Sequence, residues 1–359
     1  MPRLSQPING KPIKNSATGF PAFMGKQHAR VVTADVWAFL RDAISNDLKS
    51  PHRKQALAFL EQASEFYEAA RSPRLSCRPL LHYYSFLNLA KVFLLLKKRK
   101  IAMEPKHGIS KTKGNNRLRL ESQSIHFPKC THDHSELFPE FVAALGGNVT
   151  KPTTLKVISL LRQVPGIHRI FCLITKESPS FLPVKRFDLI KVNNGVCARL
   201  ILNKTDRDVQ QSLKKIRARR KFKSVFHQVN ADKANNDEIW FETKPVHGAR
   251  RGIHTAIKKL ADSVCEIGVW SILTSSGWRY YLSNMQPRDI LPPLASVYAT
   301  MFYLGSITRY NPYDFDKIFV GKYAWLVNEF LLTQHVQFIY GLAGQVAGVD
   351  VVRPFAVLE

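Results

Sequence analysis

Three consecutive residues, Arg309, Tyr310 and Asn311, combine side chains that can bind a nucleotide. An arginine guanidinium is a planar fork that matches phosphate oxygens, and a tyrosine ring offers a face on which a base can stack. Pro312 disfavours helical geometry at the residue before it, so the helix predicted from residue 291 ends here and presents these side chains. The alternative is structural, with the Arg309 guanidinium satisfying the last carbonyls of its own helix.

A second group of polar residues crosses the most apolar stretch of the chain, residues 78–100. Asn88 and Lys91 are neighbours on one helical face there, because they are one turn apart. A buried amide or ammonium is costly unless it is paired. The pattern predicts either a groove for substrate or RNA, or a polar contact that fixes the packing of two core helices. In a groove, the pocket residues are Asn88, Tyr84 and Tyr310, and the catalytic candidates are Arg309, Asn311 and Lys91.

A basic segment, residues 214–223, reads KKIRARRKFK and suits the binding of phosphates. Lys and Arg neutralise phosphates without reading a base sequence. A second basic stretch, HGARRGIH, extends the same chemistry. The alternative is a solvated charged helix face. The predicted nucleic-acid-binding residues are Lys214, Lys215, Arg217, Arg219, Arg220, Lys221, Lys223, Arg250 and Arg251.

Residues of metal-ligand type gather in the segment HFPKCTHDHSE. They are His126, Cys130, His132 and His134, but their spacing matches no known zinc pattern and lacks a second pair. A polar loop is the favoured interpretation, and no metal or other cofactor is predicted. The chain also lacks a glycine-rich phosphate loop and the motifs G-x-S-x-G and H-E-x-x-H.

The first part of the chain is predicted to be helical, and its helices position Tyr84, Asn88 and Lys91. Residues 1–30 form a polar lead-in, and residues 31–165 form an N-terminal helical region. A helix is predicted from about 33, with Asp35 in its first turn, and another from 51 after Ser50, where apolar residues recur at steps of three and four. Over 78–100 apolar residues cover nearly all faces, which predicts a helix in the middle of a bundle. A basic loop with a short hairpin is predicted over 101–135, followed by helices near 136–145 and 153–164.

The middle of the chain changes character. RIFCLIT, FDLIKVN, VCARLIL and EIWFET are short segments rich in β-branched and aromatic residues, which predicts strands. Residues 166–286 are therefore predicted to be a basic α+β insert with an antiparallel sheet, and 287–359 to be C-terminal helices. The predicted class is mainly α with an α+β insert. The N- and C-terminal helices form one bundle around the small antiparallel sheet region.

Two segments in this order resemble the YaaC-like family of bacterial proteins. They are RPLLHYYSFLNLAKVFLL with a later HGIS, and YLSNMQPRDILPPLASVYATMFYLGSITRYNP. The resemblance runs from about Arg71 to Gly341 and implies an architecture more than a chemistry, because the family has no established activity.

The helix HYYSFLNLAKVFLL also resembles, more distantly, the core helix of HEPN domains. Many HEPN proteins are RNases of toxin–antitoxin and antiphage systems, with a catalytic Arg followed closely by a His. Arg309 and Asn311 resemble the opening of that motif, but no His follows in TRYNPYDFD. This departure puts the RNase activity that the resemblance implies in doubt.

The charge of the whole chain favours a polyanionic partner. Lys and Arg number 53 against 27 Asp and Glu, a formal net charge of +26, and nucleic acid is the commonest partner of such a surplus. The expected function is nucleic-acid interaction, RNA rather than DNA, with metal-independent RNA cleavage or a defence or toxin role as its enzymatic version. The alternatives are a structural subunit that docks a protein partner, and a nucleotide- or small-anion-binding enzyme.

The expected compartment is the cytoplasm. The five cysteines are widely spaced without a C-x-x-C pair, which favours free thiols over a disulfide framework. The start of the chain has no apolar signal core, and the apolar stretch over 80–96 is interrupted by His82, Asn88 and Lys91. No membrane association is therefore expected.

Overall fold

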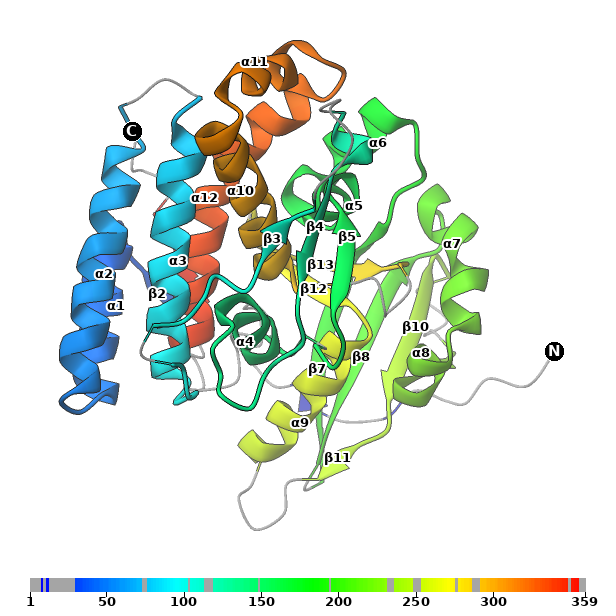
Figure 1. Ribbon diagram of the computed structural model, residues 1–359. Helices are drawn as coiled ribbons and strands as arrows, with labels where there is room; N and C mark the ends of the chain where they lie inside the picture. The colour runs from blue at the N-terminus through cyan, green and yellow to red at the C-terminus, as the bar shows by residue number, and fades with distance from the viewer. Residues whose placement is uncertain are drawn as a thin grey trace. The chain divides into compact units, whose positions relative to one another are not determined.

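A computed structural model describes residues 8, 11–12, 30–72, 76–102, 104–112, 119–147, 149–193, 195–230, 236–247, 253–274, 277–285, 291–347 and 350–354 (Figure 1). The chain divides into two compact units, each built from segments far apart in the sequence. Unit 1 comprises Met1–Val32, Ser178–Ile290 and Ala347–Phe355. Unit 2 comprises Thr33–Glu177, Leu291–Val346 and Ala356–Glu359.

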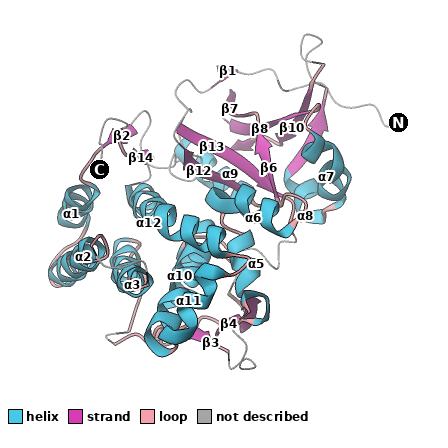
Figure 2. Cartoon of the chain, turned by 90° about the horizontal axis from the view of Figure 1, so that it is seen from above, coloured by secondary structure: helices cyan, strands magenta, loops and turns pink. Residues whose placement is uncertain are grey.

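Unit 2 begins with three helices that lie side by side when viewed along their axes (Figure 2). They are α1 (Val36–Asp47), α2 (His52–Ala69) and α3 (Arg78–Leu96). Asp35 caps α1, since its carboxylate accepts a hydrogen bond from the Ala38 amide at 2.9 Å. In α1 the buried positions Val36, Leu40 and Ile44 recur every four residues, which gives the helix one apolar face. In α3 the buried residues occur all round the helix, so α3 lies inside the unit.

The partners of α3 include helices from the other end of the chain. These are α10 (Pro293–Tyr310) and α12 (Ala324–Ala347), with α11 (Pro312–Val320) between them. Phe86 of α3 stacks on Phe338 of α12 with ring centroids 3.8 Å apart. Gly305 allows α10 to cross α3 closely, because a Cβ there would lie 3.1 Å from the Pro79 carbonyl oxygen and 3.2 Å from the Tyr83 Cβ.

The segment between α3 and α10 adds short elements to unit 2. A three-stranded antiparallel sheet has the order β3 (Ser110–Lys111), β4 (Ser124–Phe127), β5 (Thr153–Lys156). The helices here are the 3-10 turns Leu120–Ser122 and Pro165–Ile167, then α4 (Leu137–Ala144), α5 (Val157–Arg162) and α6 (His168–Thr175).

Two sequence predictions in this segment are wrong. The predicted helix over 153–164 begins as β5, because its first four residues pair with β4. The predicted strand RIFCLIT is helix α6, in which His168 and Phe171 are buried one turn apart. In an apolar segment this short, residue types alone do not distinguish a buried helix from a strand.

The described residues of unit 1 form two antiparallel sheets. The larger has the order β1 (Lys11–Pro12), β7 (Arg186–Val192), β8 (Gly195–Asn203), β10 (Glu238–Thr243), β9 (Phe226–Val229), and β11 (Val246–His247) also pairs with β8. The smaller has the order β12 (Val269–Thr274), β13 (Gly277–Ser283), β6 (Phe181–Val184). A parallel pair, β2 (Arg30–Val32) and β14 (Asp350–Val352), joins segments from the two ends of the chain.

Three helices complete the core of unit 1. They are α7 (Arg207–Ala218), α8 (Arg220–Val225) and α9 (Ile253–Glu266). Ile216 of α7, Phe222 of α8 and Leu260 of α9 belong to one apolar cluster with residues of both sheets. Phe222 packs against Phe241 of β10 with centroids 5.1 Å apart, so the basic segment is anchored to the sheet by its apolar residues.

The described residues therefore form a mainly helical protein with small antiparallel sheets. Within them, one helix, α3, is long and apolar enough to cross a membrane, and 72% of its apolar window is buried inside the protein. Burial of this extent is typical of a core helix.

Candidate functional site

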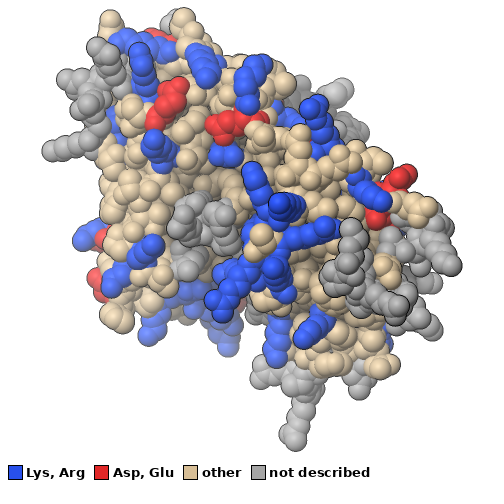
Figure 3. Space-filling view, turned by 90° about the vertical axis from the view of Figure 1, so that its right-hand side faces the viewer, with Lys and Arg blue, Asp and Glu red and all other residues tan. Residues whose placement is uncertain are grey.

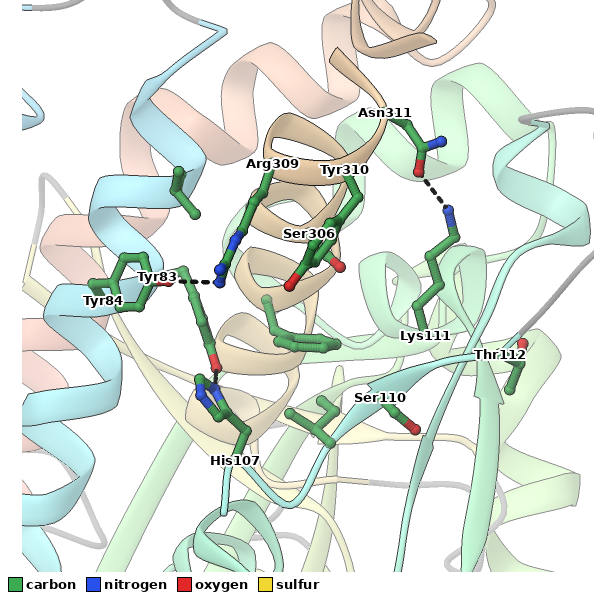
Figure 4. Close-up of a pocket in the computed structure, with 14 residues that line it drawn as sticks. Tyr83, Tyr84, His107, Ser110, Lys111, Thr112, Ser306, Arg309, Tyr310 and Asn311 are labelled. Carbon is green, nitrogen blue, oxygen red and sulfur yellow. Dashed lines mark hydrogen bonds between the residues drawn. The ribbon is translucent and has the colours of Figure 1, made fainter. Parts of the chain in front are cut away.

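A cavity of about 840 Å³ opens in unit 2 between α3, the segment from His107 to Thr112 and the C-terminal end of α10 (Figure 4). Arg309 and Lys111 bring full positive charges to its lining, and Tyr83, Tyr84 and Tyr310 bring aromatic rings. None of the described residues that line this cavity, named here the α3–α10 pocket, is an Asp or a Glu. A pocket lined by cations without carboxylates favours an anionic ligand.

Arg309 is held between two tyrosines of the α3–α10 pocket, as Figure 4 shows. Its Nη1 donates to the Tyr84 hydroxyl at 3.0 Å, and its guanidinium carbon lies 5.0 Å from the centroid of the Tyr310 ring. Tyr310 is 66% exposed, so its ring is accessible to a ligand. The guanidinium thus reaches across to α3, and the structure brings Tyr84, Arg309 and Tyr310 to one pocket.

Lys111 and Asn311 close another side of the pocket. The Lys111 Nζ donates to the Asn311 Oδ1 at 3.3 Å, and the Asn311 amide ends α10 by donating to the Ile307 carbonyl at 2.8 Å. The hydrogen bond between Lys111 and Asn311 ties strand β3 to the end of α10. The Lys111 ammonium keeps two further N–H groups with which it can donate to a ligand.

His107 is a pocket residue that sequence reasoning did not single out. Its Nδ1 is hydrogen-bonded to the hydroxyl of Tyr83, which is only 4% exposed. Burial raises the pKa of Tyr83 well above its usual value, so the phenol keeps its proton. Burial, together with the positive charges of Lys91 and Arg309, lowers the pKa of His107 below 6.5. His107 is therefore neutral at pH 7. The one sequence feature that pointed to His107 is its position in HGIS, a segment that carries the family resemblance.

The backbone around His107 is fixed by the start of α4. The Lys106 amide donates to the Ser135 carbonyl at 2.8 Å, and the His107 carbonyl accepts from the Phe138 amide at 3.2 Å. Gly108 follows with φ +69°, and a Cβ there would lie 2.7 Å from the Pro139 Cδ and 2.9 Å from the Phe138 nitrogen. Position 108 therefore requires glycine both for its conformation and for its space.

Gly108→Ala is expected to destabilise the protein by about 2–4 kcal/mol, since it adds a steric clash to a left-handed backbone. Urea denaturation measures the loss of stability. Gly146→Ala is the matched control, because Gly146 also has a positive φ (+84°) but no atom within 4 Å of the position that a Cβ would take. Equal losses of stability for the two variants would contradict the proposed clash.

Asn88 and Lys91 do not line the α3–α10 pocket as the pocket prediction required. The Asn88 Nδ2 donates to the Gln62 Oε1 of α2 at 2.7 Å, and the Lys91 Nζ lies 3.5 Å from the Asn88 Oδ1 and 4.6 Å from the centroid of the Phe59 ring. These contacts fit the packing alternative, a polar contact between two core helices. Lys91 still acts on the pocket at a distance, because its charge lowers the pKa of His107.

The basic segment of unit 1 presents most of its charges to solvent. On the face that carries α7 and α8, Lys and Arg side chains gather with few Asp or Glu among them (Figure 3). The exposed cations, named here the α7–α8 surface, are Lys214, Lys215, Arg217, Arg220, Lys221 and Lys223. Arg217 donates to the Gln228 side chain. Arg250 and Arg251 lie outside the described residues.

Arg219 does not belong to that surface, contrary to the sequence prediction. It is 8% exposed, and its guanidinium donates to the Ser283 carbonyl at 2.6 Å and to the Ile267 carbonyl at 2.9 Å. Arg219 sits between α7 and α8 with an extended backbone (φ −68°, ψ 121°), which turns its side chain inward. Its role is to join the helices to the smaller sheet.

The His/Cys segment forms ordinary polar contacts. The His126 Nδ1 lies 3.0 Å from the Thr154 Oγ1, and the His134 Nδ1 lies 3.0 Å from the Glu140 Oε1. Burial and the neighbouring Glu140 raise the pKa of the Cys130 thiol to about 11, which opposes the thiolate that a metal would need. Within the described ranges, no three His, Cys, Asp or Glu residues are grouped to hold a metal ion.

Comparison with known proteins gives one match. A family model described as YaaC-like protein matches residues 22–346, which is most of the chain. No curated protein matches, and no solved structure matches.

Proposed function

Since this chain belongs to the YaaC-like family, whose description names no activity, we propose from the α3–α10 pocket that the protein binds nucleic acid, RNA in preference to DNA. One observation carries the proposal: Arg309 lies between Tyr84 and Tyr310, with Lys111 in the same lining and no carboxylate among the described lining residues. Arginine and lysine bind phosphate, and an exposed tyrosine ring stacks an unpaired base.

The dimensions of the pocket favour a single strand. About 840 Å³ accommodates a nucleotide-sized ligand but not a double helix. A base can stack on the exposed ring of Tyr310 only when it is not stacked in a duplex. Loops and ends of RNA supply unpaired bases, which is why RNA is preferred in the proposal. A free nucleotide fits the same pocket, so a nucleotide-binding enzyme is the second candidate.

The proposal extends to place and architecture. We place the binding in the cytoplasm, in a helical bundle that the N- and C-terminal helices close together. Cleavage of the bound RNA without a metal is the enzymatic version, in which Arg309 stabilises charge on the phosphate. Lys111 replaces Lys91 as the second cation of this version, because Lys111 lines the pocket.

Binding of purified protein to labelled single-stranded RNA and to duplex DNA, across a salt series, tests the proposal. Tighter binding of the RNA, weakening steeply with salt, supports it. The recovered RNA is run on a gel to detect cleavage. No binding of either nucleic acid at low salt would overturn the proposal and leave a protein partner as the alternative. Trp325 and Leu332, exposed at 53% and 49% on α12, are then the surface to examine.

The α7–α8 surface is expected to supply sequence-independent phosphate contacts. Changing Lys214, Arg220, Lys221 and Lys223 to Gln, with Arg219 intact, should reduce the salt slope of RNA binding by about 0.7 for each phosphate that is no longer neutralised. The slope of log Kd against log salt measures this change. Unchanged slope with unchanged melting temperature would show that this surface does not touch the RNA.

A further inference from the structure

We propose that the α3–α10 pocket recognises a terminal phosphate, the monoester at an RNA end or on a free nucleotide, and that His107 is its third donor beside Arg309 and Lys111. This inference rests on the proposed function and specifies its ligand. It is carried by the arrangement of the donors in the pocket and by the hydrogen bond between Tyr83 and His107.

We assign the proton of His107 from its hydrogen bond with the Tyr83 hydroxyl. Tyr83 comes from α3, is nearly fully buried and directs its hydroxyl at the His107 Nδ1 (Figure 4). A protonated phenol can donate to the imidazole or accept from it, and in the proposed arrangement it donates, so Nδ1 is the acceptor. A neutral imidazole that accepts at Nδ1 carries its own proton on Nε2. His107 is thus held as an Nε2–H donor, which hydrogen-bonds an anion without needing a charge of its own.

The three donors belong to two segments that are tied together. His107 and Lys111 lie four residues apart, before and within β3, and Arg309 and Asn311 end α10. The hydrogen bond from Lys111 to Asn311 joins these segments at 3.3 Å. The charge of Arg309 also lowers the pKa of His107, so the guanidinium and the imidazole are electrostatic neighbours. The three donors therefore line one pocket.

A phosphate monoester matches this set better than an internal diester does. The monoester presents three non-bridging oxygens and carries about −1.5 to −2 charges at pH 7. A diester has two such oxygens and a single charge. Arg309 and Lys111 supply two positive charges, and His107 adds a neutral N–H donor. No carboxylate among the described lining residues repels the ligand. The exposed ring of Tyr310 is then free to stack the terminal base.

Binding of such an anion should be coupled to protonation of His107. In the free protein the pKa of His107 is lowered, first by burial and then by Lys91 and Arg309. A bound dianion opposes those charges and raises the pKa. Binding therefore takes up protons between the free and bound pKa values, so affinity rises as pH falls through the bound-state pKa and levels off below the free-state pKa. This signature distinguishes a ligand-contacting histidine from a structural one.

The test measures binding of a short single-stranded RNA of one sequence in three forms, with a 5′-phosphate, with a 3′-phosphate and with hydroxyls at both ends. A free nucleoside 5′-monophosphate competes with them. We expect one phosphorylated end to bind at least tenfold more tightly than the hydroxyl form. Competition by the free monophosphate at equal affinity would identify the nucleotide as the ligand and support the same phosphate site. Weak competition would identify the RNA end.

Variants at His107 and Tyr83 test the donor assignment across pH 5.5–8. His107→Gln keeps a side-chain N–H but cannot gain a proton, so it should lose the pH dependence that the wild type shows beyond the titration of the phosphate. Tyr83→Phe frees Nδ1 and should weaken phosphate-end binding severalfold. His52→Gln, at an exposed position on α2, is the matched control and should bind as wild type does. Melting temperatures confirm that each variant is folded.

The outcomes separate the two proposals. Equal affinity for phosphorylated and unphosphorylated RNA would overturn the terminal-phosphate inference and leave RNA binding in place. A His107→Gln variant with the wild-type pH profile would remove His107 from the site. If none of the RNA forms nor the monophosphate binds, the proposed function is itself overturned.

Discussion

Arg309→Ala is expected to weaken binding of single-stranded RNA by about 10- to 100-fold, because a hydrogen bond between charged groups contributes about 1.5–3 kcal/mol. The guanidinium is the central cation of the α3–α10 pocket, between the Tyr84 hydroxyl and the Tyr310 ring. Its side chain is exposed, so the variant should keep the wild-type melting temperature. Titration of labelled RNA at fixed salt measures the loss of affinity.

Two further variants show whether the effect belongs to the pocket. Arg309→Lys keeps the charge but loses the planar fork, and should fall between the wild type and the alanine variant. Arg41→Ala removes an exposed arginine from α1, outside the pocket, and changes the net charge by the same amount. If Arg41→Ala weakens binding as much as Arg309→Ala, net charge rather than the pocket accounts for the affinity.

Arg219→Ala is expected to destabilise the protein by about 3 kcal/mol or more, the largest stability effect among the basic residues considered. The substitution leaves the Ser283 and Ile267 carbonyls without the donors they now have, and it empties the space of a large buried side chain. Urea denaturation measures the change in the free energy of unfolding.

Arg220→Ala is the control for that prediction, because Arg220 directly follows Arg219 in the chain but is exposed. Its effect should stay within about 0.5 kcal/mol, as is usual for surface substitutions. RNA binding should respond in the opposite order, with Arg220 contributing to the α7–α8 surface and Arg219 contributing only through folding. An Arg219→Ala variant as stable as Arg220→Ala would contradict the buried role.

The sequence predicted those parts of the fold and site that depend on strong local patterns. Asp35 predicted the start of α1, steps of three and four predicted α2, and apolar residues on nearly all faces of α3 agree with its many buried positions. Arg309, Tyr310 and Asn311 were recognisable because Pro312 ends their helix. Tyr84 lies on α3, and the structure brings its hydroxyl to Arg309.

The rest depends on contacts that local patterns do not encode. His107 and Lys111 reach the pocket because backbone hydrogen bonds hold the loop from Lys106 to the start of α4. Any residue type except proline can form such bonds, so the sequence does not reveal them. The side chain of Asn88 donates a hydrogen bond to Gln62 of α2, and the residue types alone did not identify Gln62 as its partner. Arg219 is buried and Arg220 exposed although the residue type is the same, because the break between α7 and α8 falls on Arg219.

The packing of α3 has a consequence for how the chain is made. A ribosome synthesises α3 early, but the helices that cover it, α10 and α12, emerge only after the whole of Ser178–Ile290 has been translated. Until Phe338 is synthesised, Phe86 lacks the ring on which it stacks, and α3 can pack only on elements made earlier, such as α2. The nascent chain thus carries a partly covered helix as apolar as a membrane span, and a chaperone that binds such segments can shield its exposed side during translation.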